Sequence, residues 1–388
     1  MITPDLAADG SSSYIIDISK WATFNKSKRH LTLCLVTLHQ AVREHGDVNQ
    51  NQALFHYHQA CAAEVLNHRI KTLGQVGPNP ELFEDVSLFF FSQIQASAYG
   101  AWRAHLNAGK ALFNAWGVDA LMGKSEYEFH LFHLVIADVF GMATAPALHI
   151  SAEDAAQHKV YLGLLGRLNV DVCGTMVPIP EVVVRATTSI NIVRAAKATQ
   201  GVHTTEQGPD CEPSTLDILK SLQAFDPTNW ASHLPSRTSS HAMSWALLAT
   251  CYQTAAILYL ARTCGTSLEA NIEEPRDDYE TSSYSRLSSS IRELYDLRQC
   301  GGVLYKYILW PMVICGVETV ARKDEQQLRL LCESLEWTTV SLGTLSMREA
   351  AVFLGELWRS HNERSDGSSK KVVIDWDAIF HNAPLFLM

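Results

Sequence analysis

The residue pattern closest to a nucleotide site runs from Gly117 to Gly123-Lys124-Ser125. In a phosphate-binding loop, four residues separate the two glycines and the loop follows a buried strand. Here five residues separate Gly117 from Gly123, and the segment before them has the periodicity of an amphipathic helix. The pattern therefore does not indicate nucleotide binding.

A second candidate is the acidic run Asp277-Asp278-Tyr279-Glu280, which is superficially similar to the metal-binding motif of terpene cyclases. Such carboxylates hold magnesium when they project from one helix face into an apolar cavity. Here they follow Pro275 within a polar stretch from Gly265 to Ser283, and the chain has no clear second acidic motif. We expect a solvated acidic loop, with an acidic surface for a protein partner as the alternative.

Two histidine pairs have spacings that metal sites use: His130 with His133, and His56 with His58. Zinc would require a third and a fourth ligand with supporting spacing. Both pairs lie in apolar, aromatic-rich helical segments, so we expect partly buried structural histidines. The nine cysteines include no CxxC pair and mostly lie in apolar runs, which favours reduced, buried thiols in an intracellular protein.

The chain contains no Gly-x-Ser-x-Gly elbow, no His-Glu-x-x-His zinc motif and no dinucleotide-binding glycine pattern. We therefore assign no catalytic, cofactor-binding or metal-binding residue, expect no cofactor, and leave ligand-binding residues unassigned. A Cys–His pair assembled only in space stays open as an alternative. If a ligand site exists, the least charged segments, 239–263 and 302–321, are expected to line it.

The elements that would position such residues are helices. Apolar residues recur at helical spacing along most of the chain, for example Trp102, Leu106, Phe113 and Trp116. Helices are expected near residues 31–45, 52–73, 80–99, 102–116, 126–142, 179–199, 214–225, 239–263, 284–299, 302–321, 328–335 and 350–358. Pro80 is expected at a helix start, and Ser346 with Glu349 has a capping-box spacing. Only residues 372–374 suggest a short extended piece, so the predicted fold class is all-α with helix-on-helix packing.

One apolar helical segment, from Leu309 to Glu318, contains both Pro311 and Gly316. In a helix interior proline costs about 3 kcal/mol and glycine about 1 kcal/mol. We expect either packing that outweighs these costs or a kink at this place.

Length and composition favour a protein with a large core, since 47% of the 388 residues are hydrophobic and 19% are charged. We expect residues 1–29 to form a partly flexible N-terminal segment and residues 30–388 to form one continuous helical domain. The net charge of −10, with no evident run of Lys and Arg, argues against contact with a nucleic-acid backbone. Residues 242–261 lack charge and are long enough to span a membrane, but their polar residues favour a buried central helix over a membrane contact.

Several separated blocks together resemble one family. They are Phe55–Ala60, Trp102–Leu106 with Gly109 and Leu112, Tyr252–Leu260, Trp310–Glu318, and the closing Asp375-Trp376 with Leu385–Leu387. In this order the blocks resemble the fungal-specific transcription factor domain, the helical regulatory region of fungal zinc-cluster regulators. The resemblance covers roughly residues 30 to 388.

The resemblance implies an all-α regulatory domain, a role in transcription and a location in the nucleus, with the cytoplasm as the alternative. Family members usually carry an N-terminal zinc cluster of six cysteines with two CxxC pairs, followed by a basic linker. Neither occurs in this sequence, and only Cys34 lies within the first 60 residues. No cluster residue can be carried over, and we do not expect this chain to bind DNA directly.

We therefore expect a regulator-like protein rather than an enzyme, acting on fungal metabolic or secondary-metabolite genes through a protein partner or a small hydrophobic ligand. The alternative is a helical enzyme or carrier for a hydrophobic fungal metabolite, and a third reading is an unrelated all-α interaction scaffold. We expect no membrane association, and the oligomeric state stays open, with a homodimer as one option.

Overall fold

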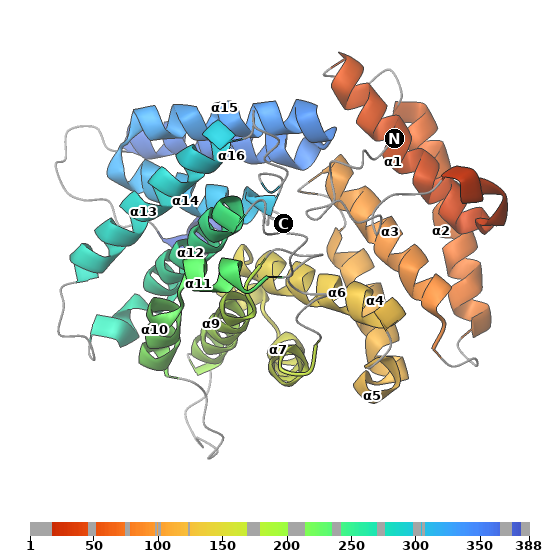
Figure 1. Ribbon diagram of the computed structural model, residues 1–388, viewed down its shortest axis with the longest axis horizontal. Coiled ribbons are helices and arrows are strands. Elements are labelled where there is room, and N and C mark those ends of the chain that lie inside the picture. Colours follow the sequence, from red (N-terminus) through yellow and green to blue (C-terminus); the bar gives the residue numbers. More distant parts are fainter. Residues whose placement is uncertain are drawn as a thin grey trace. The chain divides into compact units, whose positions relative to one another are not determined.

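The helices of the computed structural model follow one another through nearly all of the part of the chain that it describes (Figure 1). That part comprises residues 18–45, 52–73, 78–97, 99, 102–122, 125–168, 179–200, 214–234, 242–269, 276–297, 304, 307–364 and 375–381. These residues form sixteen α-helices and two short 3-10 helices and include no strand, so the predicted all-α class is confirmed.

The order of the elements is η3 (Ile18–Thr23), α1 (Lys26–His45), α2 (Gln52–Leu73), α3 (Pro80–Ala96), α4 (Trp102–Trp116), α5 (Val118–Leu121), α6 (Ser125–Ala143), η4 (Ala147–His149), α7 (Ala152–Leu165), α9 (Glu181–Gln200), α10 (Thr215–Ala224), α11 (Pro227–Ser232), α12 (Ala242–Glu269), α13 (Arg276–Leu297), α14 (Leu309–Arg322), α15 (Glu325–Leu342), α16 (Leu345–Arg364) and α17 (Trp376–Phe380). Each long helix predicted from periodicity has a counterpart here. The extended piece predicted at 372–374 lies outside the described residues.

Local sequence explains some helix boundaries and corrects others. Asn79 caps α3 by accepting a hydrogen bond from the Leu82 N–H, and Pro80 opens the helix as predicted. The capping box expected at Ser346 is wrong, because α16 already begins at Leu345. A capping box joins Ser151 and Asp154 instead, at the start of α7, a helix that periodicity did not reveal.

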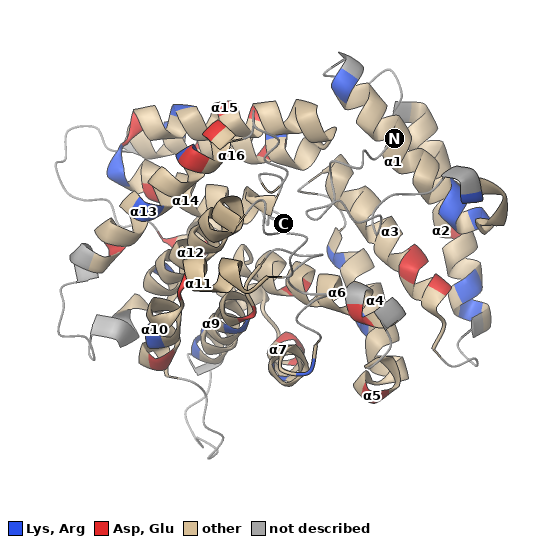
Figure 2. Cartoon of the chain, viewed as in Figure 1, with Lys and Arg blue, Asp and Glu red and all other residues tan. Residues whose placement is uncertain are grey.

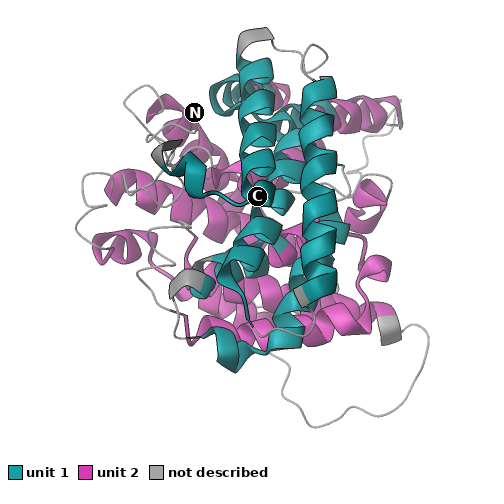
Figure 3. Ribbon diagram, turned by 90° about the vertical axis from the view of Figure 1, so that its right-hand side faces the viewer, with its two compact units in different colours: residues 1–137, 332–352 teal, residues 138–331, 353–388 magenta. Residues whose placement is uncertain are grey.

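The chain divides into two compact units, coloured separately in Figure 3. Unit 1 comprises Met1–Ala137 and Cys332–Val352, and unit 2 comprises Asp138–Leu331 and Phe353–Met388. The N-terminal segment 1–29 and the single domain 30–388 stay predictions.

In unit 1, α1 packs against α2 and α3, and α3 packs against α4. The most buried charge at this packing is Asp85 of α3, whose side chain is inaccessible to solvent. Its Oδ2 accepts hydrogen bonds from Arg69 of α2 and from Asn25, whereas Oδ1 has no hydrogen-bond partner among the described residues. Burial raises the pKa of Asp85 to about 6, and Arg69 and Asn25 offset this only in part.

In unit 2, α12 is the central helix and packs against α9, α10, α11, α13 and α14. It contains just two charged residues, Arg262 and Glu269. Most of α12 and α14 is therefore tan, the colour of uncharged residues, in Figure 2. A segment of α12, Ala242–Gly265, is long and apolar enough to cross a membrane, but 83% of its apolar window is buried within the protein. The predicted buried central helix is therefore present.

The helix that carries Pro311 continues through it, from Leu309 to Arg322. Because α14 begins at Leu309, Pro311 lies in the first turn, where a backbone N–H would have no intrahelical acceptor. Gly316 lies where α14 approaches α16, since a Cβ at this position would come within 2.5 Å of Leu354 Cδ1. The proline thus costs little, and the glycine allows two helices to pack closely.

Charged groups inside unit 2 are paired across helices. Glu318 of α14, almost fully buried, accepts two hydrogen bonds from Arg262 of α12, Nε to Oε1 at 2.5 Å and Nη2 to Oε2 at 2.7 Å. Glu280 of α13 lies 3.5 Å from the same guanidinium. The solvated loop predicted for 265–283 is therefore wrong at Glu280, because α13 begins at Arg276 and carries this residue into the interior.

The central aromatic cluster of unit 2 gives a first prediction. Trp310 is fully buried, stacks on Tyr252 with ring centroids 5.8 Å apart, and contacts Phe140 at 4.7 Å. Replacing Trp310 with Ala should lower the free energy of unfolding by about 3–5 kcal/mol, because it leaves a large cavity. Urea unfolding measures the loss, and Trp337→Ala, at a tryptophan 40% exposed, is the matched control. Equal losses in both variants would contradict a core role for Trp310.

Asp85 gives a second prediction, for the pH dependence of stability. Since burial raises its folded pKa from 3.8 to about 6, its contribution is fully present below about pH 4 and is lost as the pH rises through about 6. The free energy of unfolding of the wild type, relative to Asp85→Asn, should fall by about 2–3 kcal/mol between about pH 4 and pH 7.

Urea unfolding of both proteins at the two pH values tests this. Glu84→Gln is the control, since Glu84 is the neighbouring carboxylate but is partly exposed and paired with Lys28. A difference between wild type and Asp85→Asn that does not change with pH would contradict the buried-carboxylate account.

Candidate functional site

Arg194 lies in the second half of α9, and its side chain is only 2% exposed. Its Nη1 donates to the Tyr259 hydroxyl of α12 at 2.7 Å and more weakly to the Met142 carbonyl at 3.4 Å. Its Nη2 donates to the Ala145 carbonyl at 2.8 Å and to Asp377 Oδ1 at 2.7 Å. A buried guanidinium is tolerated only with such a set of oxygen partners.

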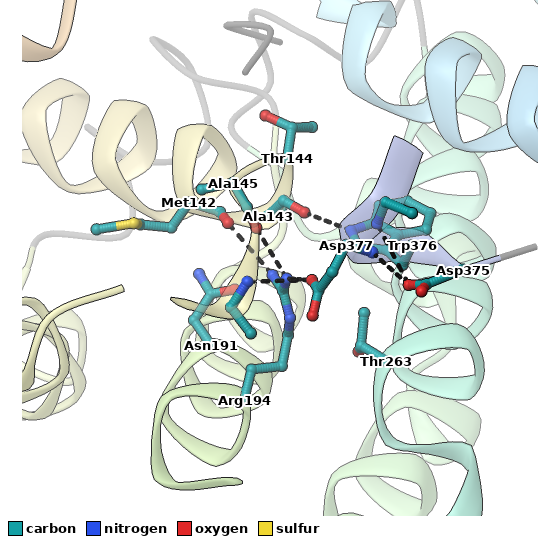
Figure 4. Close-up of polar contacts among 12 residues, drawn as sticks. Met142, Ala143, Thr144, Ala145, Asn191, Arg194, Thr263, Asp375, Trp376 and Asp377 are labelled. Atoms are coloured by element: carbon teal, nitrogen blue, oxygen red, sulfur yellow. Dashed lines mark hydrogen bonds and ion pairs between the residues drawn. The ribbon is translucent and has the colours of Figure 1, made fainter. Parts of the chain in front are cut away.

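The end of α6 explains why a cation and an indole meet here. The last carbonyls of a helix lack intrahelical partners and form its negative pole. Arg194 binds the Met142 and Ala145 carbonyls, and the Trp376 indole N–H donates to the Ala143 carbonyl at 2.9 Å (Figure 4). The arrangement therefore caps α6 with side chains that come from α9 and α17.

The short helix α17 supplies the other side of the site. Asp375 caps it by accepting hydrogen bonds from the N–H groups of Asp377 and Ala378. The cap directs Asp377 toward Arg194, and Asp377 Oδ1 also accepts from the Ala147 N–H at 3.1 Å. Trp376 packs on Tyr259 with ring centroids 5.4 Å apart, and Phe380 stacks on Phe353 at 5.5 Å.

The electrostatics of the site keep the cation charged. Burial opposes the charge on Arg194, but the Tyr259 hydroxyl and the Asp377 carboxylate together hold its pKa above the ordinary value. Burial raises the pKa of Tyr259 to about 12, offset in part by Arg194, so this phenol stays neutral. The Tyr259 hydroxyl in turn donates to Asn191 Oδ1 at 2.6 Å, and Asn191 Nδ2 donates to the Val139 carbonyl at 2.9 Å. The site can bind a carboxylate beside an aromatic ring, but it lacks a nucleophile with a lowered pKa.

The histidine pairs singled out from the sequence do not converge. His56 Nδ1 lies 3.2 Å from Gln59 Oε1, whereas His58 Nδ1 lies 3.0 Å from His30 Nδ1 on α1. His130 contacts the ring of Phe83 and His133 that of Phe91. Burial lowers the pKa of His130 to about 4. Among the described residues no group of three or more His, Cys, Asp or Glu side chains could hold a metal ion.

The other sequence candidates are separated or lie partly outside the described residues. Gly117 precedes α5, Ser125 begins α6, and Gly123 and Lys124 are not described. Six of the nine cysteines are described, all as free thiols and four of them buried, and the reduced state stays a prediction. Burial raises the pKa of Cys34 and Cys315 to about 12, so neither is poised as a nucleophile.

Two hollows in the described part of the chain bear on ligand binding. One, in unit 1 beside His105 and His133, has a volume of about 10 Å³, roughly that of one water. The other is an open hollow of about 470 Å³ on unit 2, lined by residues of 224–234 that include Trp230. Neither is lined by the segments 239–263 and 302–321 that the sequence suggested for a ligand site.

Sequence reasoning missed Arg194, Asn191 and Asp377. One signal was available: Arg194 stands between Ile192 and Val193 on one side and two alanines on the other, in an apolar stretch of the sequence. A charge in a stretch that is buried requires a buried partner. The identity of that partner was not readable, because Asp377 lies 183 residues further along the chain.

The Arg194–Asp377 pair gives a third prediction. Asp377→Asn should lower the free energy of unfolding by about 1–3 kcal/mol, below the range for fully buried pairs because Asp377 is 47% exposed. Arg194→Met should lower it by about 3–5 kcal/mol, since it also removes the cap of α6. A double-mutant cycle from urea unfolding measures the coupling. Purely additive effects would show that the two residues do not interact in solution.

Comparison with known proteins identifies the family of this chain. The family model of the fungal specific transcription factor domain matches residues 9–388, nearly the whole chain. No significant match was found among curated proteins or among solved structures. The match begins earlier than the resemblance at 30–388 and includes Arg194, Tyr259 and Asp377. The chain therefore belongs to the family of the fungal specific transcription factor domain.

Proposed function

We propose that this chain is a regulatory module of fungal transcription that acts by binding a protein partner in the nucleus. The observation that carries the proposal is the family match over residues 9–388, which supports a transcription-regulator-like role. The genes that it controls are, in this proposal, those of fungal metabolism or secondary metabolism.

The charge and the packing favour binding through protein surfaces. The net charge of −10 opposes close contact between this domain and a phosphate backbone. Large aromatic side chains such as Trp245, Trp310 and Tyr252 fill the interior of unit 2. A protein partner, rather than a deeply enclosed metabolite, is therefore the binding partner that the described residues support best.

The alternative of a helical enzyme or carrier gains no support from the described geometry. The cavity of about 10 Å³ in unit 1 is far smaller than the 300 Å³ or more, roughly, of a typical ligand pocket. The hollow near Trp230 is larger, but its Asp226 carboxylate already accepts from the Thr228 and Asn229 N–H groups as the cap of α11. Beside it the Ser232 hydroxyl lies 3.3 Å from His233 Nδ1, but both atoms also lie 2.7 Å from the Asn229 carbonyl. Because a carbonyl only accepts, this ring nitrogen carries a proton and is not a base for the hydroxyl.

Transcript profiling after gene deletion, with rescue by variants of this chain, gives a fourth prediction. Deletion should change a defined set of transcripts, and the wild-type chain should restore them. Trp310→Ala should restore few, because a destabilised chain is present at lower abundance. Arg329→Ala, at an exposed residue paired only within α15, should restore them like the wild type.

Chromatin association of a tagged chain and immunoblotting of each variant complete the test. Unchanged transcripts after deletion, or conversion of a metabolite by the purified chain, would contradict the regulatory proposal.

A further inference from the structure

The helix α17 owes its structure to its contacts. It has five residues, far fewer than a helix needs to be stable alone in water. Trp376 and Phe380 are both buried, and their rings rest on Tyr259 and Phe353. This segment is therefore helical because it is bound, as a short peptide is when it folds on its receptor.

The surface that receives α17 comes from other parts of unit 2. It offers an acceptor for an indole N–H in the Ala143 carbonyl, a cation in Arg194, and a donor to a carboxylate in the Ala147 N–H (Figure 4). Arg194 is held by Tyr259 and by the carbonyls of Met142 and Ala145, none of which belongs to α17. The receptor groups are thus oriented independently of the segment they bind.

The carboxylate of α17 approaches from the solvent side. Asp377 is 47% exposed, whereas Arg194 is 2% exposed. A carboxylate of another molecule can therefore reach the guanidinium along the same path once α17 leaves. Without any carboxylate, Arg194 would keep a buried charge with only neutral partners, which favours replacement of Asp377 over a vacant site.

We propose that this surface is a peptide-binding site, with α17 as its intramolecular occupant. The partner is a protein segment that forms a short helix with Trp, an acidic residue directly after it, and Phe or a similar residue four positions after the Trp. These are the positions of Trp376, Asp377 and Phe380. The proposal rests on the proposed function, in that the competing segment belongs to the protein partner of the regulator.

While α17 occupies the surface, it lowers the apparent affinity of the surface for an external peptide. A tethered segment acts at an effective concentration of about 1 mM or above, so an external peptide binds weakly while α17 is intact. Weakening α17 frees the surface in a larger fraction of molecules, and the apparent affinity for the external peptide rises in proportion.

Fluorescence polarisation with a labelled peptide of residues 375–381 and the full chain tests the proposal. The peptide should bind Trp376→Ala at least tenfold more tightly than the wild type, since the indole position is then vacant. Replacing the peptide's aspartate that matches Asp377 with asparagine should lower the affinity of the peptide at least tenfold. Adding Arg194→Met to Trp376→Ala should abolish binding, and Arg329→Ala alone should behave as the wild type does.

Equal affinity of the peptide for wild type and Trp376→Ala would overturn the proposal. Equal affinity of the asparagine peptide and the unsubstituted peptide would overturn it as well. If circular dichroism shows that Trp376→Ala is unfolded, Asp377→Asn replaces it, because it keeps the buried indole. If neither variant folds, α17 is an integral part of the core and the proposal is wrong. Any of these failures would leave the transcript and rescue results, and with them the proposed function, unaffected.

Discussion

A buried guanidinium constrains the organisation of unit 2. Because the Arg194 side chain is buried, its donors must find oxygens inside the protein. Those oxygens come from the end of α6, from Tyr259 of α12 and from Asp377 of α17. A single side chain thereby fixes the relation of four helices that are distant in sequence, and its requirement for a carboxylate orders the short helix near the end of the chain.

The protein contains other buried carboxylates, and they are satisfied to different degrees. Glu318 has both oxygens on Arg262 in the bidentate geometry that guanidinium and carboxylate favour. In Asp85 both hydrogen-bond donors, Arg69 and Asn25, bind the same oxygen. Burial raises the pKa of Asp85 by more than Arg69 lowers it. Asp377 is the most exposed of the three, so its pairing with Arg194 is the one that another molecule could most readily replace.

The described titratable groups fit the regulator-like role that the family match supports. Buried carboxylates such as Glu280 and Glu318 are paired with Arg262, and the thiols of Cys34 and Cys315 have raised pKa values that keep them neutral. By contrast, the end of the chain presents an aromatic and an acidic side chain to a prepared surface, which is an arrangement suited to exchange between intramolecular and intermolecular binding.

The sequence by itself determined the helical class, most of the long helices and the family. Periodicity was sufficient because a helix repeats its buried face every three to four residues, as in α4 and α15. It failed where the repeat was short or uniform. The helix α7 was missed, and the acidic stretch before Ser283 was read as a loop although Glu280 lies in α13.

The tertiary structure alone decided the role of the polar residues. Pro311 appeared costly until the start of α14 placed it in the first turn, and Glu318 needed Arg262 on another helix. Similarly, Arg194 was recognisable as an unusual charge, but its partner lies 183 residues away. Local patterns report which face of a helix is buried, whereas the partner of a buried charge depends on which distant helices meet. The choice of partner is therefore made by packing and not by any local spacing.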